Sequence, residues 1–136
     1  MFTISRRTGR LVEARVTALA TVARVDAYAE GFTPVVRQVV GRPVLCADHR
    51  PVVIYSQPVA DKLTDIFTAL NTTWERVAIL VAPTNATLSM QLGRIVRESA
   101  NPSRRVFFDP VEAGRFLGEI LDPSEQTRLR VFLEGR

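Results

Sequence analysis

The sequence contains little cysteine, lysine or histidine, with one residue of each kind among its 136 residues. Because Cys46 is the only thiol, the chain cannot form an internal disulfide framework, and this favours a reducing compartment. Cys46 and His49 alone are too few for a Cys/His metal site within one chain. On a strand, side chains three residues apart point to opposite faces, which disfavours a Cys–His nucleophilic pair.

Longer sequence signals are also missing. No apolar run approaches the length of a membrane-spanning helix. The N-terminal stretch lacks the apolar core and cleavage site of a signal peptide. The chain contains neither a glycine-rich phosphate loop nor a Gly-x-Ser-x-Gly nucleophile elbow. These absences predict a cytoplasmic, non-enzymatic protein with no catalytic residue, no cofactor, no metal and no membrane span.

The charge of the chain is basic, with a formal net charge of +4, and Lys62 is its only lysine among 18 basic residues. A basic balance can support binding to nucleic acid or to an acidic partner. A nucleic-acid footprint should cluster on one face, however, and these arginines are scattered along the sequence. The alternative function is therefore a small-ligand or nucleic-acid binder. Its basic patch would consist of Arg6, Arg7, Arg10, Arg104 and Arg105.

The first part of the chain shows two different periodicities. Apolar and polar residues alternate over residues 2–6 and 11–17, which predicts a β-hairpin. Apolar residues then recur at three- and four-residue steps over 21–40, which predicts a helix. Pro34 should kink or split this helix, and Gly41 should end it.

The stretch from Pro43 to Leu70 predicts a strand, a connection and a helix. Residues 44–48 are apolar on both faces, as in a parallel strand that is covered on both sides. Residues 51–55 are strand-like, yet they lie between a strand end and a helix start. This segment is either a short edge strand or a loop that exposes Val53, Ile54 and Tyr55 to a partner.

The helix after this connection has a clear start and a clear apolar face. Ser56 or Gln57 should cap it, and Pro58 suits its first turn. A capping serine at a helix N-terminus would also be a favourable place for a phosphate. The buried stripe is predicted to consist of Val59, Leu63, Ile66, Phe67 and Leu70.

The rest of the chain predicts two more strands and three more helices. A continuous apolar run predicts an interior strand over 76–82, and residues 105–108 predict the last strand. A helix with an apolar inner face lies between them. Two helices then begin with the same Asp-Pro-x-Glu signal, at Asp109 and at Asp122.

The order β-β-α-β-α-β-α-β-α-α predicts an α/β protein with one mixed sheet and helices packed on it. We expect a single domain over residues 1–121 and a helical extension over 122–136. The extension offers Leu129, Phe132 and Leu133, which could pack on this domain or on a partner.

With this order established, the chain resembles STAS-like domains, the fold of anti-sigma-factor antagonists of the SpoIIAA type. The resemblance covers about residues 2–121 and includes the opening hairpin. It also rests on VLCADHR at 44–50, ERVAILV at 75–81 and RRVFFDPVEAGRFLGEIL at 104–121. In the last segment a strand leads through Asp-Pro into an amphipathic helix with the pair Phe116-Leu117.

The resemblance implies a non-enzymatic bacterial module for regulation and signalling through protein binding. In regulatory members of the family, a Ser or Thr at the start of the helix after the third strand is phosphorylated by a partner kinase. Ser56 is the counterpart by position, although YSQPVADKL stands where those members have an Asp-Ser-small-Gly signature. The resemblance thus implies that Ser56 is a phospho-acceptor.

The leading hypothesis is a cytoplasmic bacterial module that binds a protein partner, or a second copy of itself. Binding would use the connection after the third strand and the start of the helix at Pro58, where apolar and aromatic side chains can act as anchors. The residues predicted to form this surface are Arg50, Val53, Ile54, Tyr55, Ser56 and Gln57.

Overall fold

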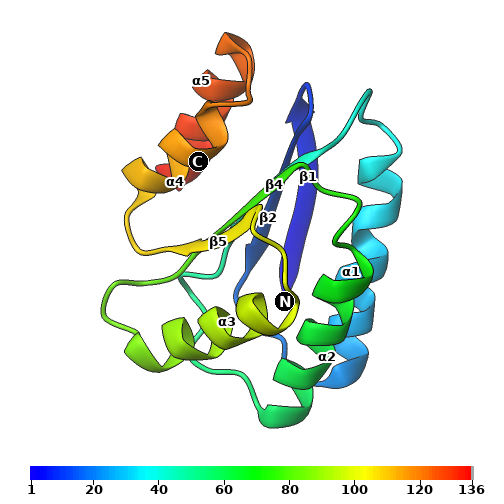
Figure 1. The fold of residues 1–136 in the computed structure, drawn as a ribbon, viewed down its shortest axis with the longest axis vertical. Helices are drawn as coiled ribbons and strands as arrows, with labels where there is room; N and C mark the ends of the chain where they lie inside the picture. The colour runs from blue at the N-terminus through cyan, green and yellow to red at the C-terminus, as the bar shows by residue number, and fades with distance from the viewer. Residues whose placement is uncertain (136) are drawn as a thin grey trace.

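The computed structural model describes residues 1–135 and contains a five-stranded mixed sheet with five helices (Figure 1), which confirms the α/β class. Among these residues, no helix is both long enough and apolar enough to cross a membrane. The elements in chain order are β1 (Phe2–Thr8), β2 (Leu11–Val16), α1 (Val22–Val36), β3 (Val44–Asp48), α2 (Gln57–Ala69), β4 (Arg76–Leu80), α3 (Ala86–Glu98), β5 (Arg104–Phe107), α4 (Pro110–Gly118) and α5 (Pro123–Leu133).

The strands lie in the sheet in the order in which they occur in the chain, β1-β2-β3-β4-β5. β1 and β2 form the predicted antiparallel hairpin, with Ile4 opposite Ala14. Gly9 in its turn has a φ of +58°, a conformation that glycine adopts without a steric cost. The other three strands run parallel to β2, so all their carboxyl ends lie at one edge of the sheet.

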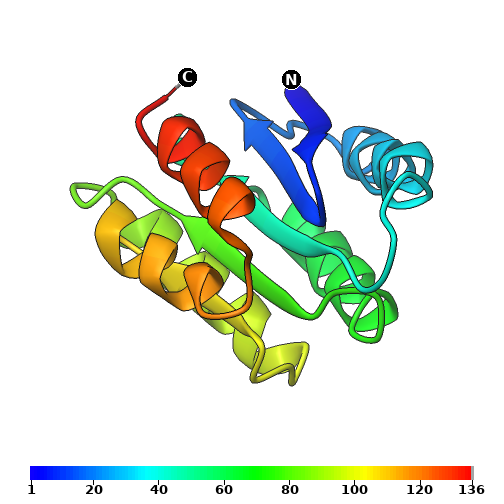
Figure 2. The ribbon, with the colours of Figure 1, turned by 90° about the horizontal axis from the view of Figure 1, so that it is seen from above.

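Helices cover both faces of this sheet (Figure 2), as parallel strands require. Helices α1, α2 and α3 bury one face, where Val12, Leu45 and Ile79 point. Helices α4 and α5 bury the other, which includes Cys46 and Leu80. Every residue of β3 is buried, which confirms the prediction for 44–48.

Helix α5 packs on its own sheet, with Leu129, Phe132 and Leu133 all buried. Several polar contacts also tie it to the strands. The carboxylate of Glu13 on β2 is buried and accepts two hydrogen bonds from the guanidinium of Arg128, at 2.7 and 2.6 Å. The hydrophobic stripe on α5 is therefore covered within this chain.

The start of α5 is fixed by a capping box under the hairpin turn. The side chain of Asp122 accepts from the Glu125 N–H, and the Glu125 carboxylate accepts from the Asp122 N–H. Glu125 also accepts from the Arg10 N–H. A Cβ at Gly9 would lie 2.1 Å from Glu125 Oε2, so glycine is needed there for close approach as well as for its φ.

The buried Arg104 joins the C-terminal ends of α2 and α3. Arg104 is buried and forms no ion pair with a carboxylate among residues 1–135, and burial lowers the pKa of its guanidinium to about 10. It donates to the Phe67 carbonyl in the last turn of α2 and to the Ser99 hydroxyl at the end of α3. It also donates to Asn71 Oδ1 and lies over the Phe67 ring at 4.6 Å. The negative ends of the two helix dipoles thus take the place of a carboxylate.

The structure differs from the predicted boundaries mainly in the first helix. We predicted a helix over 21–40 that Gly41 ends, but α1 already ends at Val36. Pro34 cannot donate a backbone hydrogen bond, and the next turns are bonded in i→i−3 steps, such as Val39 N–H to Val36 C=O. Gly41 does have a positive φ, but in the connection beyond the helix.

The Glu13–Arg128 pair gives the first testable prediction. Replacing Arg128 with alanine leaves a buried carboxylate without its main partner, so the free energy of unfolding should fall by about 3 kcal/mol. The double variant Glu13→Leu/Arg128→Met removes both charges and should recover most of this loss. Urea unfolding followed by the fluorescence of Trp74, which is buried, measures both values.

The matched control is Arg94→Ala, which breaks the exposed Arg94–Glu98 pair within one helix. This variant should change stability little, because exposed ion pairs are screened by water. If the double variant were as unstable as Arg128→Ala, the unpaired carboxylate of Glu13 would not be the cause of the lost stability, and the prediction would be wrong.

Candidate interaction surface

The candidate surface lies at the carboxyl ends of the parallel strands, where sites occur in open α/β sheets. β3 ends at Asp48, and residues 49–56 connect it to α2. The segment Pro51–Tyr55 contains no strand, so of the two alternatives left by the sequence it is the loop. We call residues 50–56 the β3–α2 loop.

Asp48, the last residue of β3, holds the start of this loop through hydrogen bonds with Arg50. The Asp48 carboxylate accepts from the Arg50 guanidinium at 2.9 and 3.0 Å and also from the Arg50 N–H. Burial alone would raise the pKa of Asp48, but hydrogen bonds from Arg50 and the charges of Arg50 and Arg15 outweigh burial and lower it. Arg50 also donates to the Leu133 carbonyl at the end of α5. Arg50 is therefore largely engaged within the chain.

Tyr55 does not lie where we predicted it. Its side chain is only 2% exposed, so the expectation that Tyr55 is an exposed aromatic anchor is wrong. The phenol oxygen lies 2.7 Å from Nδ1 of the buried His49, and burial raises the pKa of the phenol. The hydroxyl gives the buried imidazole a hydrogen-bond partner, and the ring anchors the loop to the core.

Cys46 and His49 are separated by the sheet. The thiol faces α4 and α5, whereas the imidazole contacts Tyr28 and Tyr55 on the opposite face. Burial raises the pKa of Cys46 and lowers the pKa of His49 to about 4. A buried neutral imidazole and a buried protonated thiol on opposite faces cannot act as a pair. Among residues 1–135, no group of three or more His, Cys, Asp or Glu side chains is placed to hold a metal ion.

Two side chains from the α3 region hold the β3–α2 loop in place. The side-chain amide of Asn85 donates to the Val52 and Val53 carbonyls, at 3.2 and 2.7 Å. The amide of Gln91 pairs with the backbone of Tyr55 in both directions, accepting from its N–H and donating to its C=O. Four hydrogen bonds thus fix the backbone of the loop against a neighbouring helix.

The fixed loop presents apolar side chains to solvent. Val53 is 76% exposed and Ile54 is 59% exposed, as the sequence predicted, while Val52 turns inward. Ser56 and Gln57 follow at the start of α2, and both are exposed. Ser56 is the N-cap by position, but its side chain makes no capping hydrogen bond, contrary to our expectation.

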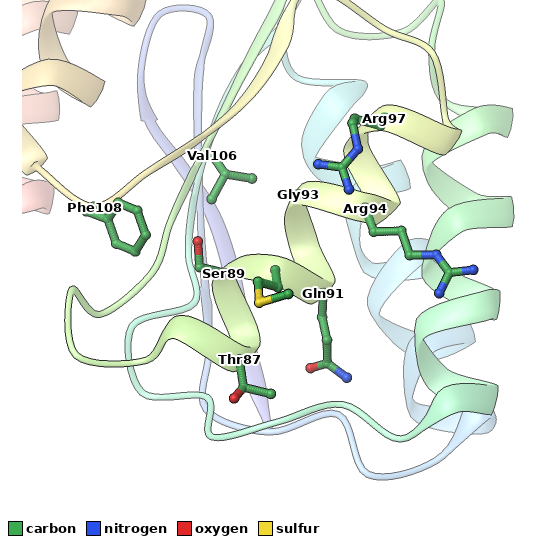
Figure 3. A pocket seen from close by; sticks show the side chains of 9 residues that line it. Thr87, Ser89, Gln91, Gly93, Arg94, Arg97, Val106 and Phe108 are labelled. Carbon is green, nitrogen blue, oxygen red and sulfur yellow. The ribbon is translucent and has the colours of Figure 1, made fainter.

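A groove of about 730 Å³ continues this surface beside α3 (Figure 3). Val106 and Phe108, on and just after β5, form one wall, and the exposed side of α3 forms the other. Gln91 belongs both to the loop contacts and to the groove, so the two features are continuous. We call it the α3–β5 groove; it is lined by Thr87, Ser89, Met90, Gln91, Gly93, Arg94, Arg97, Val106 and Phe108.

The structure does not bring the arginines of the alternative hypothesis together. Arg6, Arg7 and Arg10 lie at the hairpin of β1 and β2, whereas Arg104 and Arg105 lie on β5 at the opposite edge of the sheet. Arg104 is buried, and the Arg10 guanidinium donates to Glu75, Arg42 C=O and Ile120 C=O. These residues do not form one basic patch.

Sequence reasoning did not identify Asn85 and Gln91 as loop supports or Phe108 as a groove residue. Their partners are more than 30 residues away or lie across a groove, so no local pattern signals them. The signal available for Phe108 was a large apolar residue at the end of the strand predicted over 105–108.

No family model, curated protein or solved structure matches this chain.

The His49 pocket predicts how stability depends on pH. The pKa of His49 is lowered from 6.5 to about 4 by burial, so protonation favours the unfolded chain. The stability that this neutral imidazole contributes is fully present above pH 6.5. It should fall by about 3 kcal/mol as the pH drops towards 4. Urea unfolding at a series of pH values measures this slope.

His49→Gln is the control, because glutamine does not titrate in this range and can still hydrogen-bond the Tyr55 hydroxyl. Its stability should be lower at neutral pH but should vary less between pH 6.5 and 4. Because His49 is the only histidine, a single imidazole NMR signal reports its pKa directly. An imidazole that titrates near 6.5 in the folded protein would contradict the prediction.

Proposed function

We propose that the protein is a non-enzymatic protein-interaction module that binds a partner, or a second copy of itself, through the tip of the β3–α2 loop and the start of α2. The observation that carries this proposal is the pair Val53 and Ile54, which are exposed on a backbone fixed by Asn85 and Gln91. Apolar side chains on a rigid loop bind with a smaller loss of conformational entropy than those on a mobile one.

The arrangement of charge supports binding rather than catalysis at this edge. His49 and Tyr55, whose side chains could take part in proton transfer, are buried and hydrogen-bonded to each other. Asp48 is neutralised by Arg50, and Arg15 lies close by. What remains accessible is an apolar tip beside the hydroxyl of Ser56 and the amide of Gln57, a combination typical of an interface.

We further infer a bacterial, cytoplasmic, STAS-like regulatory module in which Ser56 is the phospho-acceptor. The agreement between the element order and the order that led to the resemblance supports this inference. Ser56 is exposed, and its hydroxyl makes no capping hydrogen bond, so a kinase could reach it. A phosphate there would lie at the positive end of the α2 dipole and beside Val53 and Ile54.

The binding surface is tested by Val53→Asp/Ile54→Asp. Two carboxylates at the tip should weaken partner binding by at least about tenfold, because they must be desolvated at the interface. They should change the free energy of unfolding by no more than about 0.5 kcal/mol, since both side chains are exposed. Affinity capture from the native host with quantitative mass spectrometry measures partner binding, and light scattering measures self-association.

The matched control is Val40→Asp, because Val40 is 91% exposed and lies just before β3, at the opposite end of the strand. Val40→Asp should retain every partner that the unchanged protein captures. If the loop variant also retained all of them and the same oligomeric state, the loop would not be the binding surface.

The regulatory inference is tested with Ser56→Glu and Ser56→Ala. The glutamate should reduce partner capture severalfold, as a negative charge enters an apolar interface, while the alanine should bind like the unchanged protein. The glutamate should also stabilise the helix start by about 0.5 kcal/mol. Ser124→Glu adds the same charge at an exposed serine in the first turn of α5, away from the loop and the groove, and serves as the control. If Ser56→Glu and Ser56→Ala captured the partner equally well, Ser56 would not be a regulatory switch. The proposed binding surface would not be affected by that result.

A further inference from the structure

In the described part of the chain, no strand pairs with the outer edge of β5. The sheet order ends at β5, and the Val81 N–H donates to the Phe107 C=O at 3.0 Å. Successive residues of a strand direct their backbone groups to alternate sides, so the N–H and C=O of Val106 point away from β4. Within residues 1–135, the Val106 N–H donates to no other element and the Val106 C=O accepts from none. This edge can therefore accept another strand.

The α3–β5 groove runs beside this open edge and could receive side chains of an added strand. Val106 projects from β5 towards α3, and Phe108 lies just beyond the strand (Figure 3). Met90, which is 74% exposed, provides a flexible apolar surface on α3. Strand addition uses backbone hydrogen bonds for affinity and such side pockets for specificity.

The charge of the groove is of one sign. Arg94 and Arg97 line it, and no carboxylate does. Arg94 pairs with Glu98, whereas Arg97 has no ion-pair partner among the described residues. On the other face of β5, towards α4, Arg105 is also exposed, with its guanidinium 4.8 Å from the centre of the Phe116 ring. A ligand that carries carboxylates would complement this charge.

We propose that the β5 edge and the α3–β5 groove bind an extended acidic segment of a protein partner by strand addition. The segment pairs with the backbone of Val106, places an apolar side chain against Met90 and Phe108, and brings a carboxylate to Arg97. β5 has four residues, so the added strand is short and the complex is transient. This inference goes beyond the proposed function and does not depend on the β3–α2 loop.

The same charges disfavour a second copy of the chain as the occupant. Two β5 edges that met would bring Arg97 and Arg105 of both copies into one interface. Like charges in an interface cost several kcal/mol. An edge strand that carries arginines is also a common way to prevent edge-to-edge pairing.

The test is selection of short random peptides, displayed on phage, against the complete protein. Enriched peptides should combine alternating apolar residues with Asp or Glu, and their synthetic forms should bind more weakly at high salt. Hydrogen exchange should show protection of the Val106 amide only when a peptide is bound. The amide of Phe107, which pairs with β4, should be protected with and without the peptide.

Two variants separate the backbone contribution from the charge contribution. Val106→Pro removes the outward N–H of an edge strand and also replaces a side chain that packs against the core, and it should abolish peptide binding without removing a sheet hydrogen bond. Arg97→Glu leaves the backbone unchanged and should weaken binding about tenfold or more. Arg37→Glu reverses an exposed charge at the end of α1 and should bind like the unchanged protein. If Val106→Pro did not fold, peptide binding by Arg97→Glu and protection of the Val106 amide would still test the proposal.

The proposal would be overturned if no peptide were enriched, if the enriched peptides were basic, or if they bound equally well to Arg97→Glu. A dimer that forms through β5, detected by light scattering and disrupted in Val106→Pro, would replace it. The Val53→Asp/Ile54→Asp variant should still bind the selected peptides. Failure of the loop experiment and failure of the β5 experiment are therefore distinguishable.

Discussion

The fold depends on the need of a largely parallel sheet to be covered on both faces. Every residue of β3 is buried, and this is possible only because α1, α2 and α3 cover one face while α4 and α5 cover the other. The second cover is the smaller one and comes from the end of the chain. Its attachment combines apolar packing with the ion pair between the buried Glu13 and the half-buried Arg128. The C-terminal helix is thus an integral part of the sheet's packing.

Once both faces are covered, the remaining polar backbone and loops lie at the edges of the sheet. At the carboxyl edge, Asp48 and Arg50 neutralise each other, and His49 and Tyr55 satisfy each other in the interior. Asn85 and Gln91 then bind the loop backbone. These contacts leave the apolar tip of the loop exposed on a backbone that hydrogen bonds hold in place, which is a favourable state for a binding surface.

The elements of the fold could largely be predicted from local patterns. Period-two alternation indicated the hairpin, the apolar run indicated β4, and the Asp-Pro-x-Glu signals indicated the starts of α4 and α5. The site could be predicted only in part. Val53 and Ile54 were expected to be exposed and are, but Tyr55 turns inward because His49, six residues earlier, offers its hydroxyl a buried partner. A loop sequence does not contain that information.

Periodicity, capping and turn residues lie close together in the chain, and they predict the class of fold, the order of its elements and the position of the loop. Tertiary packing, in contrast, turns Tyr55 inward and covers α5. It also separated the arginines of the hairpin from those of β5 and placed Met90 opposite Phe108. Burial, charge and hydrogen bonding at these positions depend largely on partners distant in sequence, which only sheet order and packing bring together.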